Sequence, residues 1–273
     1  MAAILDGPLD QAAFASVALV ERTDSSVPWA VLSVPGRGRG HNEDRWCVDD
    51  ARCVFALGDG MGGYSAGEVA SEIAVRTVSE MVVALHDAGL DTEDALERAF
   101  AAAHAGILDF AHTRIECLGM GTTLVAAAVA GDRLTLAHVG DSRAYRLRGA
   151  VLSRLTADHS IGQQMVEAGR LTEVQVRRLP ARGILTRALG IGADAPTPSL
   201  AVTDWHPQDL LMLCSDGLTD RLDDAALARL LGQSDACLGE RAQALIAEAL
   251  AAGCTDDVTV LLAGASQPGC GSH

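Results

Sequence analysis

Residues 54–63 read Val-Phe-Ala-Leu-Gly-Asp-Gly-Met-Gly-Gly, an apolar run that ends in an aspartate among glycines. The apolar part, Val54–Leu57, predicts a short buried strand. The glycines around Asp59 let the backbone turn sharply and come close to an ion. A carboxylate at the end of a buried strand is costly unless a positive charge neutralises it. The stretch favours a strand that delivers an acidic ligand, although alone it also fits a plain glycine turn.

Four more acidic motifs lie far apart in the chain, at Arg39–Asp44, Gly140–Ser142, Ser215–Gly217 and Asp256–Thr259. Three of them adjoin apolar stretches that predict strands, at Leu134–Val139, Leu210–Cys214 and Val258–Leu262. Carboxylates that converge from such distant segments need a multivalent cation. The first motif also carries an arginine, whose forked guanidinium suits a phosphate. An oxygen-rich metal site beside a phosphate clamp suggests metal-assisted phosphoester hydrolysis.

With these motifs in this order, the chain from about Trp29 to Gly264 resembles the metal-dependent type-2C (PPM) serine/threonine protein phosphatases in their compact bacterial form. The resemblance rests on boxes at Arg39–Asp44 (R-x-x-N-E-D), Asp59–Gly63 (D-G-M-G-G), Gly67–Ser71 (G-E-V-A-S), Gly119–Thr123 (G-M-G-T-T), Gly140–Arg143 (G-D-S-R), Asp158–Ser160 (D-H-S), Thr186–Gly190 (T-R-A-L-G), Cys214–Leu218 (C-S-D-G-L) and Asp256–Val260 (D-x-V-T-V). A single box can occur by chance, whereas the ordered series is very unlike an accident.

The predicted elements are strands in meanders separated by pairs of long helices, which favours α+β layers over a βαβ alternation. Further strands are expected at Trp29–Val34, Trp46–Val48, Thr123–Val129, Ala144–Arg148 and Leu200–Val202, with a partial strand at Ser16–Val20. Helices are expected at Gly67–Ala88, Thr92–His112 with Thr92 as N-cap, Ser160–Ala168, Thr172–Arg178, Asp223–Leu231 and Leu238–Ala251. The resemblance sharpens this to a four-layer α-β-β-α sandwich of two antiparallel sheets flanked by helices, with a flap insertion.

We expect an N-terminal extension at residues 1–28, one catalytic domain at residues 29–264 and a C-terminal tail at residues 265–273. The flap spans about residues 158–190, and the resemblance places it next to the active site. It carries five arginines in an otherwise acidic protein, namely Arg170, Arg177, Arg178, Arg182 and Arg187. They either guide an anionic phosphoprotein to the cleft or pair with Glu167, Glu173 and neighbouring acids.

The resemblance also implies a set of metal ligands. Asp59 would bridge two metals, and the Gly60 carbonyl would bind one of them. Asp216 and Asp256 match the other direct ligands, while Glu43 and Asp44 match acids that hold metal-bound waters. Asp141 matches a residue that holds a third, weaker metal together with Asp216; the alternative for Asp141 is a plain β-turn residue.

Arg39 has the spacing of the family's phosphate-binding arginine, and with Asp59 and Asp216 it completes the expected catalytic set. Arg37 is the neighbouring alternative. The final box departs from the family, which usually reads D-N-V-T where this chain reads Asp256-Asp257-Val258-Thr259. Aligning on Val-Thr makes Asp256 the ligand and Asp257 the substitute for asparagine. Met61 stands where many eukaryotic relatives carry a histidine, so the donor of the leaving-group proton stays open.

The implied mechanism is hydrolysis of protein phosphoserine and phosphothreonine by a hydroxide that bridges two Mn²⁺ or Mg²⁺ ions and attacks phosphorus in line. Arg39 and the metals would stabilise the charge on the equatorial oxygens, and no phosphoenzyme forms. Expected partners are phosphorylated proteins, including a bacterial serine/threonine kinase that the enzyme opposes and that kinase's substrates. A regulator of the same fold that binds phosphoprotein without turnover is the alternative, although the ligand aspartates are all present.

The composition excludes several other classes of function. The net charge of −15 argues against a nucleic-acid partner. All basic residues are arginine, so mechanisms that need a lysine, such as a Schiff base or a kinase P-loop, are excluded. The seven cysteines have no paired spacing, and a C-x₅-R phosphatase motif is absent because Cys214 and Arg221 lie one residue too far apart. With neither a signal-peptide pattern nor a membrane-length apolar run, we expect a cytoplasmic monomer.

Overall fold

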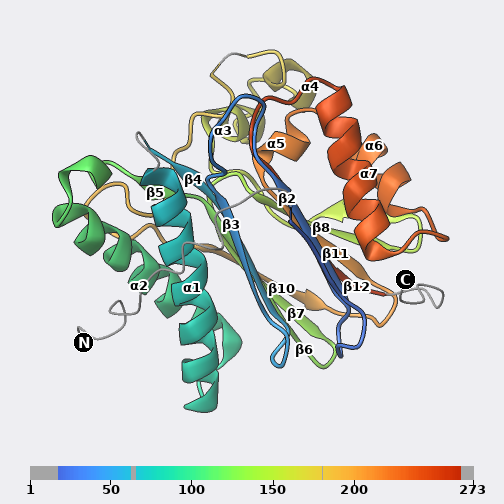
Figure 1. Ribbon diagram of the computed structural model, residues 1–273, viewed down its shortest axis with the longest axis horizontal. Helices are drawn as coiled ribbons and strands as arrows, with labels where there is room; N and C mark the ends of the chain where they lie inside the picture. Colours follow the sequence, from blue (N-terminus) through green and yellow to red (C-terminus); the bar gives the residue numbers. More distant parts are fainter. Residues whose placement is uncertain (1–17, 63–65, 180, 266–273) are drawn as a thin grey trace.

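The computed structural model describes residues 18–62, 66–179 and 181–265 (Figure 1). Its strands are β1 (Ala18–Arg22), β2 (Trp29–Val34), β3 (Asp44–Asp49), β4 (Val54–Met61), β5 (Gly121–Thr122), β6 (Leu124–Ala130), β7 (Arg133–Val139), β8 (Arg143–Arg148), β9 (Val151–Arg154), β10 (Ser199–Asp204), β11 (Leu210–Cys214) and β12 (Val258–Gly264). Its helices are α1 (Ala66–Asp87), α2 (Thr92–His112), the 3₁₀ turn η2 (Ile115–Cys117), α3 (Ile161–Glu167), α4 (Glu173–Val176), α5 (Asp216–Thr219), α6 (Asp224–Leu231) and α7 (Leu238–Ala251).

The strands form two sheets. One has the order β1-β2-β12-β11-β8-β9, and the other has the order β10-β7-β6-β4-β3, with β5 paired to β4. Every strand pairing within the described residues is antiparallel. Figure 1 shows α1 and α2 on one side of the sheets and α6 and α7 on the other. The predicted α-β-β-α sandwich is confirmed.

The central strands are apolar along their whole length because both of their faces are covered. In β11, Leu211 and Leu213 point into the core between the two sheets, while Leu210, Met212 and Cys214 point to the core under α6 and α7. Such alternation follows from the two-residue period of a strand. β4 behaves in the same way toward α1 and α2. Apolar burial on both faces therefore places these strands in the interior, and the acidic motifs lie at or beside their ends.

Several elements differ from the sequence predictions. Asp91, not Thr92, caps α2, because its side chain accepts a hydrogen bond from the Asp94 amide. The strand expected at 16–20 begins outside the described residues, and β1 at Ala18–Arg22 pairs with β2 at the sheet edge. The short strands β5 and β9 and the one-turn helix α5 were not predicted, because segments this short carry little periodic pattern; α4, of similar length, was predicted only as part of the longer stretch Thr172–Arg178.

The acidic motifs meet at one end of the sandwich. Asp216 follows β11 and Asp256 precedes β12, and these strands pair antiparallel with Cys214 opposite Val260. Asp44 begins β3 and lies opposite Asp59 near the end of β4. Since antiparallel neighbours place the end of one strand beside the start of the next, four distant segments reach one place. The flap helices α3 and α4 lie at this same end (Figure 1).

Candidate metal centre

Asp44 links the two sheets. It belongs to β3, and its Oδ2 accepts hydrogen bonds from the hydroxyls of Ser215 and Thr259, each at 2.7 Å, which belong to the other sheet's segments. Its Oδ1 is buried and has no hydrogen-bond partner among the described residues. An unpartnered carboxylate oxygen is expensive to bury. Oδ1 therefore suits a cation, or a water that a cation holds.

Asp59 is fixed through its backbone by two threonines. The Asp59 amide donates to Thr123 Oγ1 at 2.9 Å, and the Thr123 amide and the Thr122 hydroxyl both donate to the Asp59 carbonyl at 2.9 Å. Thr123 Oγ1 also shares a 2.7 Å hydrogen bond with the hydroxyl of Ser142. These contacts explain the G-M-G-T-T box, whose role the sequence did not reveal: its threonines hold the backbone that presents the Asp59 carboxylate.

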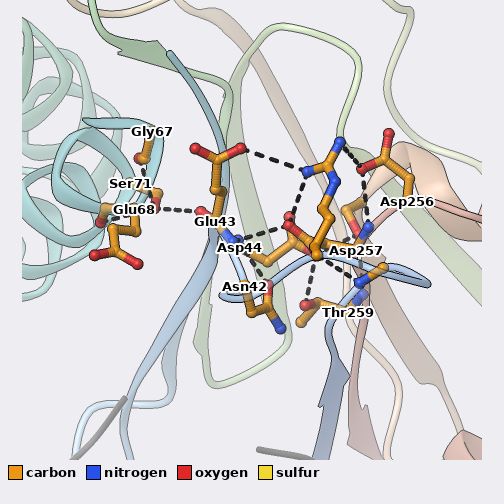
Figure 2. Close-up of polar contacts among 12 residues, drawn as sticks. Asn42, Glu43, Asp44, Gly67, Glu68, Ser71, Asp256, Asp257 and Thr259 are labelled. Carbon is orange, nitrogen blue, oxygen red and sulfur yellow. Dashed lines mark hydrogen bonds and ion pairs between the residues drawn. The ribbon is translucent and has the colours of Figure 1, made fainter. Parts of the chain in front are cut away.

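Gly60 is required where β4 meets the start of α1. A Cβ atom at this position would overlap the carbonyl oxygens of Gly67 and Glu43. The Gly60 amide donates to the Glu43 carbonyl at 3.2 Å, and the Ser71 hydroxyl donates to the same carbonyl at 2.6 Å (Figure 2). The first turns of α1 therefore hold the backbones of Glu43 and Gly60 together at the point where β3 and β4 pair.

The aspartates of this end repel one another. Burial raises the pKa of Asp59 well above the usual carboxyl range, and the charges of Asp44, Asp216, Asp141 and Asp256 raise it further. Burial likewise raises the pKa values of Asp44, Asp141 and Asp216. Repulsion of this kind is relieved by a multivalent cation. The five carboxylates thus form an electrostatic cluster with the chemistry of a hard-metal site.

In the described residues, the side chains of this cluster are not arranged as a complete metal-coordination site. Across residues 18–62, 66–179 and 181–265, no three acidic, histidine or cysteine side chains stand close enough together to hold a metal ion as they are. The structure brings the charges of five aspartates close enough to interact, while the metal contacts of every predicted ligand remain predictions. The orphaned Oδ1 of Asp44 and the raised pKa values are the observations that fit a cation.

Arg39, which the sequence predicts to bind a phosphate, is surrounded by acidic side chains in the structure. Its Nη2 is 2.7 Å from Asp256 Oδ1, and its Nη1 is 3.1 Å from Asp257 Oδ2 and 3.4 Å from Glu43 Oε2. The side chain is 40% exposed, so it can still reach a ligand at the mouth of the site. Arg37, the neighbouring alternative, is exposed and pairs with no acidic side chain in the described residues. The geometry favours Arg39.

Two hollows adjoin the cluster, and the flap borders both. One, of about 610 Å³, is lined by Asp59, Met61, Asp141 and Asp216 on one side and by Gly183 and residues 185–188 of the flap on the other. The second, of about 410 Å³, lies between Asp141, Asp216 and the flap arginines Arg177 and Arg182. The flap is thus a wall of the cleft. Arg182 tethers it by a 2.7 Å ion pair with Asp220 beside α5.

Arg177 and Arg178 are exposed, and in the described part of the chain they form no ion pair with Glu167 or Glu173. These two residues therefore do not follow the alternative in which the flap arginines pair with Glu167, Glu173 and neighbouring acids, whereas Arg182 does so through Asp220. Arg187 contacts His159 Nε2 at 3.4 Å. His159 itself accepts a hydrogen bond from the Gly140 amide and contacts the Ser199 hydroxyl, which agrees with a structural role.

Cys214 does not have the properties of a nucleophile. Burial raises the pKa of its thiol to about 12, so the reactive thiolate is scarce at neutral pH. Its side chain belongs to the apolar core under α6 and α7. The cysteine-phosphatase alternative therefore loses its only candidate from the sequence.

Comparison with known proteins gives a consistent result. The chain matches the family model "Protein phosphatase 2C" over residues 40–252. A serine/threonine phosphatase (stp) of Listeria innocua is 37% identical over 233 residues, which cover 83% of this chain and 91% of that protein. The serine/threonine protein phosphatase PstP of Mycobacterium tuberculosis is 36% identical over 235 residues, which cover 86% of this chain and 44% of that longer protein.

Solved structures agree with the sequence matches. A crystal structure of the Mycobacterium tuberculosis phosphatase PstP superposes with a TM-score of 0.79 at 35% identity, covering 88% of this chain and 99% of that one. A structure of the PstP catalytic domain in complex with two manganese ions superposes with a TM-score of 0.75 at 34% identity, covering 90% of this chain and 99% of that one.

Proposed function

Because this chain belongs to the protein phosphatase 2C family and is a protein serine/threonine phosphatase, we propose that its hydrolysis of phosphoproteins depends on two divalent cations, Mn²⁺ or Mg²⁺. The residues that would hold them are Glu43, Asp44, Asp59, Gly60, Asp216 and Asp256, with Asp141 and Asp216 available to a third, weaker ion. The manganese complex of PstP supports a dinuclear centre. The all-oxygen ligand set suits these hard ions better than zinc.

When bound, such ions supply positive charge that lowers the pKa of a coordinated water and offsets the charge of the phosphoryl group. The chain's own residues do the rest. Thr122 and Thr123 orient Asp59. Arg39 offers guanidinium N–H groups to the phosphoryl oxygens. Met61 lines the cleft and has no proton to give, so the leaving alkoxide takes its proton from water.

The observation that carries this proposal is the cluster of mutually repelling carboxylates beside an arginine at the mouth of a cleft. The test is release of inorganic phosphate from a phosphothreonine peptide in the presence of Mn²⁺. Turnover with no enzyme-bound phosphate supports direct attack on phosphorus. Tight binding of the peptide without phosphate release would identify the alternative, a binding regulator of the same fold.

We further propose that the physiological substrates are a bacterial serine/threonine kinase and the proteins it phosphorylates, and that the enzyme acts as a monomer in the cytoplasm. All six cysteines of the described residues are free, which suits a reducing compartment. Among the described residues, no helix combines the length and apolarity that a membrane crossing demands.

Arg39→Ala is expected to lower kcat/KM for a phosphopeptide by about 10- to 150-fold, equivalent to about 1.5–3 kcal/mol for a lost charged hydrogen bond. Mn²⁺ affinity, measured by calorimetry, should change little, because arginine is not a ligand. Arg37→Ala is the matched control, since Arg37 is an exposed neighbour without an ion pair in the described residues. Equal losses in both variants would remove Arg39 from the phosphate site.

Neutralising Arg177 and Arg178 together by glutamine is expected to lower kcat/KM for a phosphoprotein about 3- to 10-fold and to weaken its salt dependence, because both cations are exposed and Arg177 lines the cleft. Hydrolysis of a small aryl phosphate should stay nearly constant. Arg98→Gln, at an exposed arginine on α2, controls for the loss of an exposed positive charge as such. Equal losses on both substrates would show that the flap supports the catalytic centre and does not select the partner.

A further inference from the structure

Asp257, the residue that replaces the family's usual asparagine, is a buried carboxylate near the metal centre with hydrogen bonds to both of its oxygens. It is 3% exposed. Its Oδ1 accepts a hydrogen bond from the Gly36 amide at 2.6 Å. Its Oδ2 accepts one from the Glu43 amide at 2.9 Å and one from Arg39 Nη1 at 3.1 Å. Figure 2 shows Asp257 between Asp256 and the Asn42–Asp44 segment, at the centre of these contacts.

These bonds hold both ends of the loop that delivers Arg39. Gly36 begins the loop and Glu43 ends it, and within it the Arg39 amide donates to the Gly36 carbonyl at 3.1 Å to close a turn. Gly36 packs so closely on the chain before Asp257 that an added Cβ would lie 2.5 Å from the Thr255 carbonyl oxygen. The loop is therefore seated on the segment that leads to Asp257, and the carboxylate fixes it from both sides.

Only a carboxylate can make all three contacts. Both of its oxygens accept, whereas the amide of an asparagine has one accepting oxygen and one donating NH₂ group. An asparagine in this place would set a donor against either the Gly36 amide or the pair formed by the Glu43 amide and Arg39 Nη1. At least one of these N–H groups would lose its acceptor, and burying an unpaired donor is costly.

The charge matters as well as the shape. A guanidinium has five N–H donors in a fixed planar fork. Nη1 is bonded to Asp257 and Nη2 pairs with Asp256 at 2.7 Å, and together these contacts set the plane of the fork while the remaining donors stay available to a phosphate oxygen. A guanidinium without this anchor would have to lose the freedom of a long side chain on each binding event.

We infer that Asp257 is a positioning residue for substrate phosphate: it holds the loop of residues 36–43 and orients the Arg39 guanidinium. This inference rests on the proposed function, since it concerns how the phosphorylated substrate is held. Asp257 does not touch the phosphoryl group, and the effect of changing it passes through Arg39.

Asp257→Asn, which keeps the shape of the side chain, is expected to raise the KM for a phosphothreonine peptide about tenfold and to change kcat less than about twofold. The inhibition constant of inorganic phosphate should rise by a similar factor. On an Arg39→Ala background the same substitution should add almost nothing, because the residue through which it acts is gone. The shift of the melting temperature by inorganic phosphate, measured by thermal unfolding, should shrink in parallel and provides a readout without turnover.

The matched control is Asp209→Asn. Asp209 is also fully buried, and it accepts hydrogen bonds from the Arg148 side chain and from the His206 amide. It lies at the opposite end of β11 from Asp216. Asp209→Asn should lower the melting temperature with an unchanged KM. If Asp257→Asn does not fold, Asp257→Glu takes its place with the same expected rise in KM, since it keeps the charge but displaces both oxygens.

Three outcomes would overturn the inference. Additive effects of Asp257→Asn and Arg39→Ala would show a purely structural role. A fall in KM would show that Asp257 competes with the phosphate for Arg39. An unchanged KM would show that the anchor is dispensable. Failure of the proposed function looks different: the wild-type enzyme itself would then release no phosphate from the peptide in Mn²⁺.

Discussion

Asp59→Asn is expected to lower phosphatase kcat/KM by more than about 100-fold, because changes to groups that merely support metal ligands already cost 10- to 100-fold. Asp59 is the carboxylate on which the charges of Asp44, Asp216, Asp141 and Asp256 all act. Removing its charge weakens the attraction for a cation at the centre of the cluster. Asp216→Asn should behave alike, since burial raises the pKa of this aspartate too.

The same substitution should stabilise the protein when divalent cations are chelated. Removing one of several buried carboxylates that repel one another lowers the free-energy cost of keeping the others buried and ionised. The measurement is kcat/KM with Mn²⁺, together with the melting temperature in EDTA. Asp109→Asn, an exposed aspartate on α2, is the control and should change neither. A near-normal rate in Asp59→Asn would refute the assignment of the metal centre.

The sequence predicted the strands and the core well where a carboxylate adjoined an apolar run. The runs that became β4, β7, β11 and β12 marked both the core and the position of each aspartate, because a buried strand shows up as continuous apolar residues. Arranging these strands into two sheets, however, came from the family resemblance. Apolar periodicity shows which residues are buried and does not show which strands are neighbours.

The sequence could not reveal the hydroxyl and amide partners of the acids. Asp44 accepts hydrogen bonds from Ser215 and Thr259, which lie 171 and 215 residues away along the chain. Serine and threonine in strands and turns carry no signal for such contacts. Asp257 was seen as a departure from the family, yet its bonds to Gly36, Arg39 and Glu43 depend on how two distant segments pack.

Chelation of divalent cations is expected to bring phosphatase activity to background. Mn²⁺ should restore it at least as well as Mg²⁺, since the proposed ligands are hard oxygens. Saturating Mn²⁺ at about 100 times its dissociation constant should also raise the melting temperature by about 5–10 °C, the shift expected when a ligand binds only the folded state of a chain of this size. Full activity in excess EDTA after dialysis would refute metal dependence.

Both the stability of the chelated protein and the stabilisation by Mn²⁺ should depend on pH. In the chelated protein the pKa values of Asp44, Asp59, Asp141 and Asp216 are raised by burial and mutual repulsion, so the folded state binds protons more tightly than the unfolded chain. The stability that these groups contribute is therefore present at low pH and is lost as the pH rises from about 4 through their raised folded-state values. Mn²⁺ competes with those protons, so the rise in melting temperature that it causes should be largest at neutral pH and should shrink toward pH 5.

Thermal unfolding at several pH values, with EDTA or Mn²⁺, measures both trends, and Asp59→Asn should flatten them. A metal-induced shift that is the same at pH 5 and pH 7.5 would show that the cation binds away from these carboxylates.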